Sequence, residues 1–215
     1  MLLALSLAGA TYAWFTFATV ATVDSFTGKI GSDGVNLVIA NNPDGPFAES
    51  CELILDSTAK DLKPITTTDL EQFFIPVSVD LNGDAKDNKY RDVTAQAGSY
   101  LWHGTVWLKS EDEPCTVFLD PELLYFGEDK LALSAMRCGL RFHAKSGTIT
   151  YLFETTEEGV ASVCRQASCK LEKDEVAAVE YWLFLDGNDP ECKNPVQAKD
   201  VSLQLGFFGG DSAKQ

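Results

Sequence analysis

The sequence predicts an all-β protein, organised as a jelly-roll-type two-sheet sandwich. Short runs rich in Val, Ile, Thr and aromatic residues recur along the chain, and clusters of Gly, Pro, Asn and Asp separate them. Residues 100–109 and 201–208 alternate along the chain with a period of two, as strands do when one face is buried. Together with the few helical stretches, these patterns predict roughly eight to ten strands in one domain, residues 31–215.

The first part of this domain contains three predicted strands. A short helical turn is expected at Thr66–Asp69, whose hydroxyl and carboxylate groups are good caps, before Leu70 and Phe73. The polar tract 82–92 is expected to be a loop. The predicted strands cover residues 35–40, 51–55 and 74–81.

The second part contains longer apolar runs. Ser146 and Gly147 form a turn signal between two of them and predict a hairpin. Residues 155–173 are polar and contain Cys164 and Cys169, and residues 186–190 (DGNDP) predict a tight turn. The predicted strands cover residues 100–109, 115–119, 131–143, 148–153, 176–185 and 201–208.

The charge balance excludes several classes of partner. The chain carries a net charge of −15, whereas binding of nucleic acid requires clustered Lys and Arg. The same charge disfavours binding to anionic lipid, and it suits a soluble surface protein. We therefore expect no nucleic-acid partner.

The first thirty residues carry two consecutive signals. No charged side chain precedes Asp24, and the Leu- and Ala-rich run 2–7 leads into the small residues of segment 9–13. This pattern is typical of an export signal cleaved before Trp14. The usual basic segment is missing before the run, so residues 1–13 are predicted to be either a cleaved signal peptide or a retained hydrophobic segment.

Residues 14–30 are rich in aromatic and β-branched residues and predict an apolar strand. A free strand of this kind is an edge that must be covered, and the groove of a neighbouring subunit would cover it. Two alternatives remain: the first strand of the protein's own sheet, or a pilin-like helix over residues 1–23, long enough to span a bilayer. The residues expected to carry the contact are Trp14, Phe15, Phe17, Val20, Val23, Phe26 and Ile30.

Six cysteines fit an exported protein with up to three disulfides, and they allow fifteen pairings. The alternative is six buried free thiols. A zinc site is disfavoured because no C-x-x-C pair occurs and the chain has only two histidines. The candidate disulfide residues are Cys51, Cys115, Cys138, Cys164, Cys169 and Cys192.

Three stretches together resemble one family. Residues 9–16 (GATYAWFT) resemble the junction in proteins that use the SipW-type signal peptidase of Gram-positive bacteria. Residues 100–110 with 117–120 resemble the middle strands of TasA/camelysin-like proteins, and residues 179–192 with 200–203 resemble the close of that group. The stretch from 41 to 92 carries no such resemblance.

The resemblance implies a jelly-roll subunit that is exported and displayed outside the cell or on its surface. In that family subunits polymerise into fibres of biofilm matrix or surface appendages, and the N-terminal strand of one subunit completes the sheet of the next. Such a contact is head-to-tail and produces an open filament. The expected partners are therefore copies of the same chain in a homopolymer, and contact with a membrane is expected only through an uncleaved N-terminal segment.

No catalytic constellation accompanies this resemblance, although camelysin carries a peptidase label. The sequence has no H-E-x-x-H, no G-x-S-x-G and no Gly-rich phosphate loop. His103 and His143 lie on separate predicted strands, where structural roles are more common than metal binding. We expect a protein that is not an enzyme; a secreted camelysin-like protease is the alternative.

An acidic loop is a candidate calcium site. Oxygen ligands recur at alternate positions as in the start of an EF-type loop, but Ala85 replaces the required Gly and Arg91 replaces the final Glu. A solvated loop is the competing interpretation. A second, weaker candidate is the set Asp186, Asn188 and Asp189. No other cofactor is expected. The candidate calcium ligands are Asp80, Asn82, Asp84 and Asp87.

Overall fold

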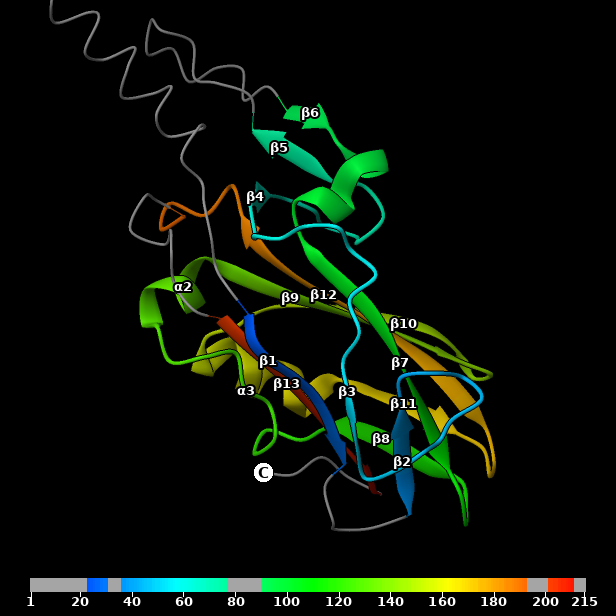
Figure 1. The fold of residues 1–215 in the computed structure, drawn as a ribbon. Coiled ribbons are helices and arrows are strands. Elements are labelled where there is room, and N and C mark those ends of the chain that lie inside the picture. Colours follow the sequence, from blue (N-terminus) through cyan, green and yellow to red (C-terminus); the bar gives the residue numbers. More distant parts are fainter. Residues whose placement is uncertain (1–22, 31–35, 77–89, 193–200, 211–215) are drawn as a thin grey trace, which may run out of the picture.

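The computed structural model describes residues 23–30, 36–76, 90–192 and 201–210, and β-strands are the main secondary structure of this part of the chain, with just under half of its residues (Figure 1). The prediction of an all-β protein is confirmed at that level. Most strand pairs are antiparallel, which allows short turns between consecutive strands and one solvated face on a sheet.

The larger of the two main sheets is the six-stranded sheet. Its strands follow the order β10-β9-β12-β7-β2, and the short β4 pairs with β12. All neighbours along that order run antiparallel. Its members are β10 (Gly147–Glu154), β9 (Met136–Ala144), β12 (Val176–Asp186), β7 (Trp102–Ser110), β2 (Leu37–Ala40) and β4 (Pro64–Ile65).

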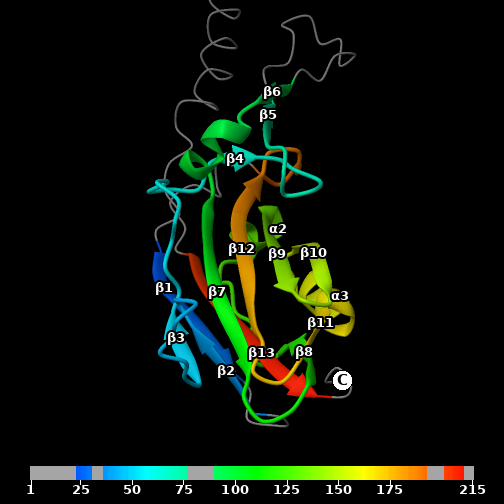
Figure 2. The same ribbon diagram turned by 90° about the vertical axis from the view of Figure 1, so that its right-hand side faces the viewer.

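The second main sheet is the five-stranded sheet, in the order β11-β8-β13-β1-β3. It contains the first and the last strand of the described chain side by side, and these two run parallel (Figures 1 and 2). Its members are β11 (Ser168–Leu171), β8 (Cys115–Leu119), β13 (Val201–Gly210), β1 (Val23–Ile30) and β3 (Ser50–Glu52).

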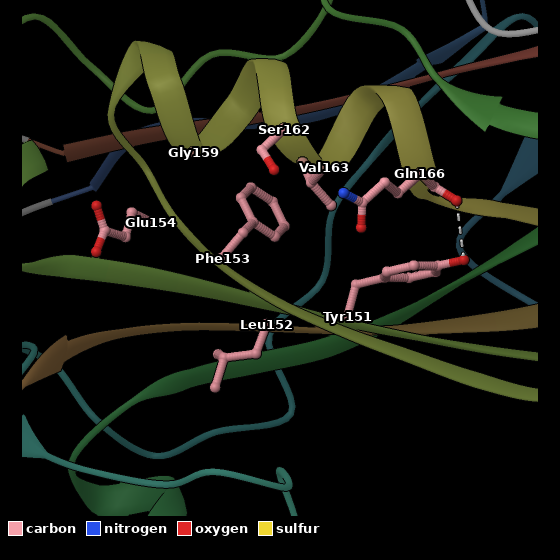
Figure 3. Close-up of a pocket in the computed structure, with 8 residues that line it drawn as sticks. All are labelled: Tyr151, Leu152, Phe153, Glu154, Gly159, Ser162, Val163 and Gln166. Atoms are coloured by element: carbon pink, nitrogen blue, oxygen red, sulfur yellow. Dashed lines mark hydrogen bonds between the residues drawn. The ribbon is translucent and has the colours of Figure 1, made fainter.

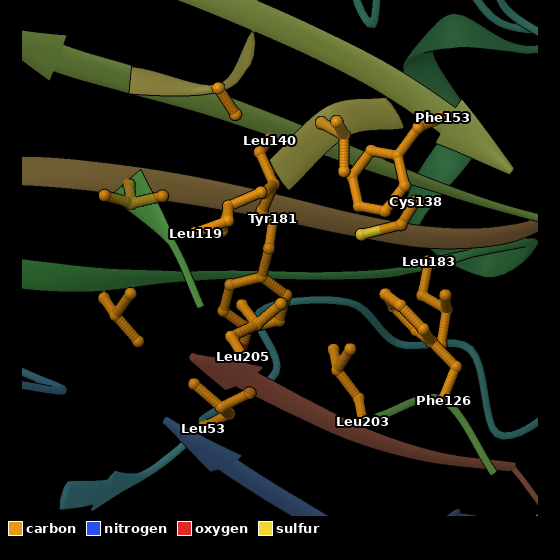
Figure 4. Close-up of a cluster of buried hydrophobic side chains, with 14 of the residues drawn as sticks. Leu53, Leu119, Phe126, Cys138, Leu140, Phe153, Tyr181, Leu183, Leu203 and Leu205 are labelled. Carbon is orange, nitrogen blue, oxygen red and sulfur yellow. The ribbon is translucent and has the colours of Figure 1, made fainter. Parts of the chain in front are cut away.

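The two sheets bury a shared apolar core. Inner-face side chains of β12, such as Val179, Tyr181 and Leu183, have no exposed surface, and they belong to the same cluster as Leu203 and Leu205 of β13 (Figure 4). Period-two alternation explains this, since one face of each strand is apolar and turns toward the other sheet. The core therefore joins segments that are far apart in sequence.

Tyr181 connects this core to a loop. Its hydroxyl donates a hydrogen bond to the carbonyl of Ile54 at 2.8 Å, and burial raises the pKa of that hydroxyl above its ordinary value of 10.0. Gly104 on β7 leaves room for the contact, because a β-carbon there would collide with both the Ile54 carbonyl oxygen and the Tyr181 hydroxyl. A glycine is required at this position by close approach of the backbone and not by its dihedral angles.

A second, smaller apolar cluster covers the outer face of one end of the six-stranded sheet. Trp182 and Phe184 of β12 point away from the main core and pack against side chains of the segment 61–101. That segment contains the two-stranded sheet of β5 (Phe74–Pro76) and β6 (Tyr90–Asp92), and the 3-10 helix η1 (Thr94–Ser99) (Figure 1). Both faces of β12 are therefore buried along this part, which explains its nearly continuous apolar sequence.

Three local predictions are wrong. The expected helical turn near Leu70 does not form: the side chains of Thr67 and Asp69 accept hydrogen bonds from the next backbone N–H groups, but the chain bends and continues without a helix. The apolar run 131–143 was expected to be one strand, and the structure divides it between α2 (Lys130–Ala135) and β9. The polar tract 82–92 was expected to be a loop, but its last three residues form a strand, Tyr90–Asp92. The polar stretch 155–173, for which no element was predicted, forms α3 (Glu157–Gln166) and β11.

The α3 helix begins at a well-formed cap. The Thr156 hydroxyl accepts a hydrogen bond from the backbone N–H of Gly159 at 3.3 Å, and Glu157 and Glu158 place negative charge in the first turn. Val163 and Cys164 on one side of the helix are buried. The helix thus covers the space at the β10 and β11 ends of the two sheets (Figure 2).

Candidate assembly interface

The N-terminal strand β1 lies inside the five-stranded sheet and not at its edge. On one side it pairs in parallel with β13, from Val23 opposite Val201 to Ile30 opposite Phe207. On the other side it pairs antiparallel with β3, with Thr27 opposite Glu52. A backbone hydrogen bond from Ile30 to the Glu49 carbonyl, at 2.9 Å, extends this second contact.

The opposite edge of β13 is held by a continuous part of the chain. β8 pairs with the end of β13, and the following loop continues along the strand, where Tyr125 and Gln204 exchange backbone hydrogen bonds of 3.0 and 2.7 Å. The Gln204 amide side chain also donates to the Leu123 carbonyl at 2.8 Å. These contacts involve residues 115–126 alone, so they do not depend on β1.

β1 is therefore the one described segment that bridges β13 and β3. If it left the sheet, β13 would lose its backbone partners along one edge, and the buried side chains of Leu203 and Leu205 would lie beside an open position. β1 is the first strand of the described chain, so it can leave the sheet without breaking the chain connection between any two other described strands. The arrangement is that of a groove between two strands, filled by a terminal strand.

The structure places part of the predicted contact segment in this groove. Val23, Phe26 and Ile30 lie in β1, opposite Val201, Leu203 and Phe207, with a register irregularity between Val23 and Phe26. Ile30 is partly buried and packs against the main core. The other predicted residues, Trp14, Phe15, Phe17 and Val20, lie outside the described residues, as do residues 1–13.

All six cysteines are free thiols in the structure, so the predicted disulfides stay a prediction. Burial raises the pKa of every one of these thiols, for example to about 11 for Cys51 and to about 12 for Cys164, Cys169 and Cys192. Cys115 and Cys138 shift in the same direction for the same reason. The neutral thiol is the favoured form at each position, which disfavours nucleophilic chemistry there.

The two histidines lie on the outer face of the six-stranded sheet, on either side of Glu180. His143 Nε2 is 2.7 Å from one Glu180 carboxylate oxygen, and His103 Nε2 is 3.8 Å from the other. Arg141 approaches the same carboxylate at 3.8 Å and lies over the Trp182 ring, with its guanidinium carbon 5.2 Å from the ring centre. The histidines thus share a charged partner, which sequence separation alone did not indicate.

Of the two candidate cation sites, only the weaker one lies within the described residues. Asp80, Asn82, Asp84 and Asp87 lie outside the described residues. In the weaker candidate set, Asp189 lies 2.7 Å from the Arg137 guanidinium and Asp186 lies 3.8 Å from it. A calcium ion there would compete with a cation already present. Within the described ranges, no group of three or more His, Cys, Asp or Glu side chains could hold a metal ion.

A shallow pocket of about 250 Å³ lies between β10 and α3 (Figure 3). Tyr151 and Phe153 point toward the helix, and the Tyr151 hydroxyl donates to the Gln166 carbonyl at 3.2 Å. Glu154 is the one charged residue among those that line it. The pocket offers no pair of acid and base groups, so it gives no reason to assign a reaction.

Sequence reasoning did not indicate which strands pair with the N-terminal segment. β3 has only three residues, and its pairing with β1 left no periodic signal in the sequence. No helix in the part of the chain that the structure describes is long and apolar enough to cross a membrane. Comparisons with protein-family models, with curated proteins and with solved structures found no match to this chain.

Proposed function

We propose that this chain is a structural, non-enzymatic subunit of an extracellular filament, which polymerises head-to-tail by donor-strand complementation. The observation that carries the proposal is the interior position of β1 between β13 and β3. A terminal strand in an interior position can be replaced by the same strand of another copy with no change in register. The replaced strand is then free to enter a third copy, and the contact repeats without closing.

The apolar sequence before β1 supports the same proposal. Residues 14–22 continue the segment toward the N-terminus with Trp, Phe, Thr and Val, which suit a strand. In this proposal residues 1–13 direct export and the remaining chain is a jelly-roll-type sandwich. The net charge of −15 keeps subunits apart, so a specific strand contact is needed to hold them together.

A pair of cysteines across β1 and β3 tests the proposal directly. Thr27 lies opposite Glu52, so Thr27→Cys with Glu52→Cys places two thiols on neighbouring strands. In an exchanged polymer the disulfide joins two chains, and oxidised fibres should run as a ladder of covalent oligomers on a non-reducing gel. In a self-complemented monomer the same disulfide is internal, and the band stays at monomer mass.

The single variants Thr27→Cys and Glu52→Cys are the matched controls, because they separate the new disulfide from reactions of the six native thiols. Deletion of residues 14–30, which removes the whole proposed donor strand including β1, should in addition give protein that forms no fibres in electron micrographs. The proposal is wrong if the double variant forms fibres whose chains carry only the internal disulfide, or if the deletion variant still polymerises.

A further inference from the structure

The described outer edges of the two main sheets are very different from one another. On the five-stranded sheet, β11 has four residues including Lys170, and β3 has three residues ending in Glu52. On the six-stranded sheet, β2 has four residues, and Ile39 exchanges backbone hydrogen bonds of 2.8 and 2.9 Å with Ala48. Short length, charge or a covering segment protects each of these three edges against association.

The fourth edge, β10, is neither short nor charged before its last residue, and α3 lies only against its second half. It runs for eight residues, GTITYLFE, with no charged residue or proline before Glu154. Its register with β9 is continuous from Gly147 to Glu154, so no bulge twists the edge away. Within the described part of the chain, β9 is its one strand partner.

Large apolar side chains remain exposed on this strand. Ile149 is 36% exposed and Leu152 is 37% exposed, on opposite faces of the strand. The α3 helix lies against residues 151–154, on the face that carries Tyr151 and Phe153: Phe153 is 8% exposed, and Tyr151 reaches Gln166 (Figure 3). Long, uncharged and partly apolar edges are sites of strand pairing between chains.

We infer that β10 pairs antiparallel with β10 of a second copy of this chain, around a two-fold axis at Thr150. In this register Thr148 lies opposite Leu152 and Ile149 lies opposite Tyr151 of the other copy. The paired window 147–153 then contains no charge, whereas a shift toward the C-terminal end would bring Glu154 of both copies into it. The pairing joins two six-stranded sheets edge to edge.

The absence of charge on this edge, and not the net charge of the chain, makes it suited to a second copy. Two copies that each carry a net charge of −15 repel, so they approach best where both surfaces are uncharged. The edge of β10 is such a surface, and it is matched in length and composition by itself. Residues directly opposite on antiparallel strands also face the same side, so Ile149 and Tyr151 of both copies contact each other.

This contact lies on a different sheet from β1 and goes beyond the proposed strand exchange. It would join subunits side by side, while strand exchange joins them end to end. The β1–β3 disulfide test detects only strand exchange. The Thr150 variants described next detect only pairing at the β10 edge. Failure of one therefore leaves the other unaffected.

Charge exchange at Thr150 tests the inference. Thr150 is exposed, so Thr150→Lys and Thr150→Glu should both fold. The full chain is used with β1 locked to β3 of the same copy by the oxidised Thr27→Cys/Glu52→Cys pair, so that strand exchange is blocked. Sedimentation velocity over a range of concentrations should then show a dimer for the protein that keeps Thr150. Each variant alone places like charges opposite each other on the axis and should need at least about tenfold higher concentration to dimerise.

An equimolar mixture of the two variants should recover dimerisation, because lysine then faces glutamate across the axis. Both variants also lose the 3.2 Å hydrogen bond between the Thr150 hydroxyl and Arg141, so recovery in the mixture cannot come from that bond. Ile54→Lys is the matched control: Ile54 is 51% exposed but lies away from the edge, and the variant should dimerise normally.

The inference is overturned if the protein that keeps Thr150 is monomeric at all concentrations. It is also overturned if the mixture of Thr150 variants stays monomeric, since the occupant of the edge is then not a second β10. Equal weakening by Ile54→Lys would attribute the effect to overall charge and would likewise reject the pairing.

Discussion

β12 and β13 are the central strands of their sheets, but they obtain their neighbours in different ways. β12 lies between β7 and β9, two strands from the middle of the chain that pair with it antiparallel along most of its length. β13 lies between β8 and β1, and its pairing with β1 is parallel and joins the two ends of the described chain.

In the proposed assembly, this difference separates a permanent part of the fold from an exchangeable one. The six-stranded sheet can be completed by residues 37–186 alone, without either end of the described chain. The five-stranded sheet includes β1 from the N-terminal region. The proposed assembly therefore uses the second sheet, while the first keeps the subunit folded.

Removal of a core aromatic from the permanent part should have the largest effect. Phe142 on β9 has no exposed surface, and its ring lies 6.1 Å from Tyr151 and 6.2 Å from Phe207. Phe142→Ala should lower the free energy of unfolding by about 3–5 kcal/mol in urea titrations, whereas Ile30→Ala on β1, at a half-buried position, should cost about 1–2 kcal/mol. Equal costs for the two variants would contradict the distinction between the sheets.

Hydrogen exchange should show a smaller but more local difference. Amides of β1 can open when one terminal strand leaves, while amides of β12 require disruption of pairs on both sides. We expect β1 to exchange roughly a hundredfold faster than β12 in the monomer, and to become protected in fibres. Exchange of both strands at one common rate would show that β1 unfolds only with the whole domain.

The smallest expected effect is a pH dependence on the outer face of the six-stranded sheet. Burial lowers the pKa of His103 below its ordinary 6.5, and Arg141 acts in the same direction, while Glu180 and Asp56 oppose it. The unfolded chain therefore binds a proton at a higher pH than the folded one, so this contribution to stability is present above pH 6.5 and is lost as the pH falls through the folded pKa.

Urea unfolding at pH 7.5 and 5.5 measures this effect. The unchanged protein should lose more stability between the two values than His103→Gln, in which the titrating group is absent. His143 and Glu71 approach Glu180 and Arg141 on the same face and are retained in both proteins, so the comparison isolates His103. An equal loss in the two proteins would reject this role of His103.

Much of the strand pattern could be predicted from the sequence, because a strand with one buried face needs apolar residues at alternate positions. The prediction for 115–119 matches β8, and those for 176–185 and 201–208 differ from β12 and β13 by one or two terminal residues. The hairpin predicted from Ser146 and Gly147 is confirmed, but its turn lies at Lys145 and Ser146, and Gly147 is the first residue of β10. In these places local composition and long-range packing favour the same structure.

The remaining features depend on contacts that local patterns do not encode. An apolar run such as 131–143 suits either a buried helix or a strand, and only its neighbours divide it into α2 and β9. Thr156 and the two glutamates after it were a usable signal for α3. The pairing of β1 with β3 and β13, which forms the candidate interface, joins residues too distant in the chain for any spacing rule.

The parallel pairing of β1 with β13 also sets the order in which the subunit can be completed. β1 emerges before β13 during synthesis, and the strands of the six-stranded sheet lie between the two in the chain. The six-stranded sheet can form in between, so the first strand has to wait for β13 until that part of the chain has been made. During that interval β3 is the one described partner that β1 has from its own chain. In the proposed assembly, the delay gives strands of different copies an opportunity to meet before any one subunit closes on itself.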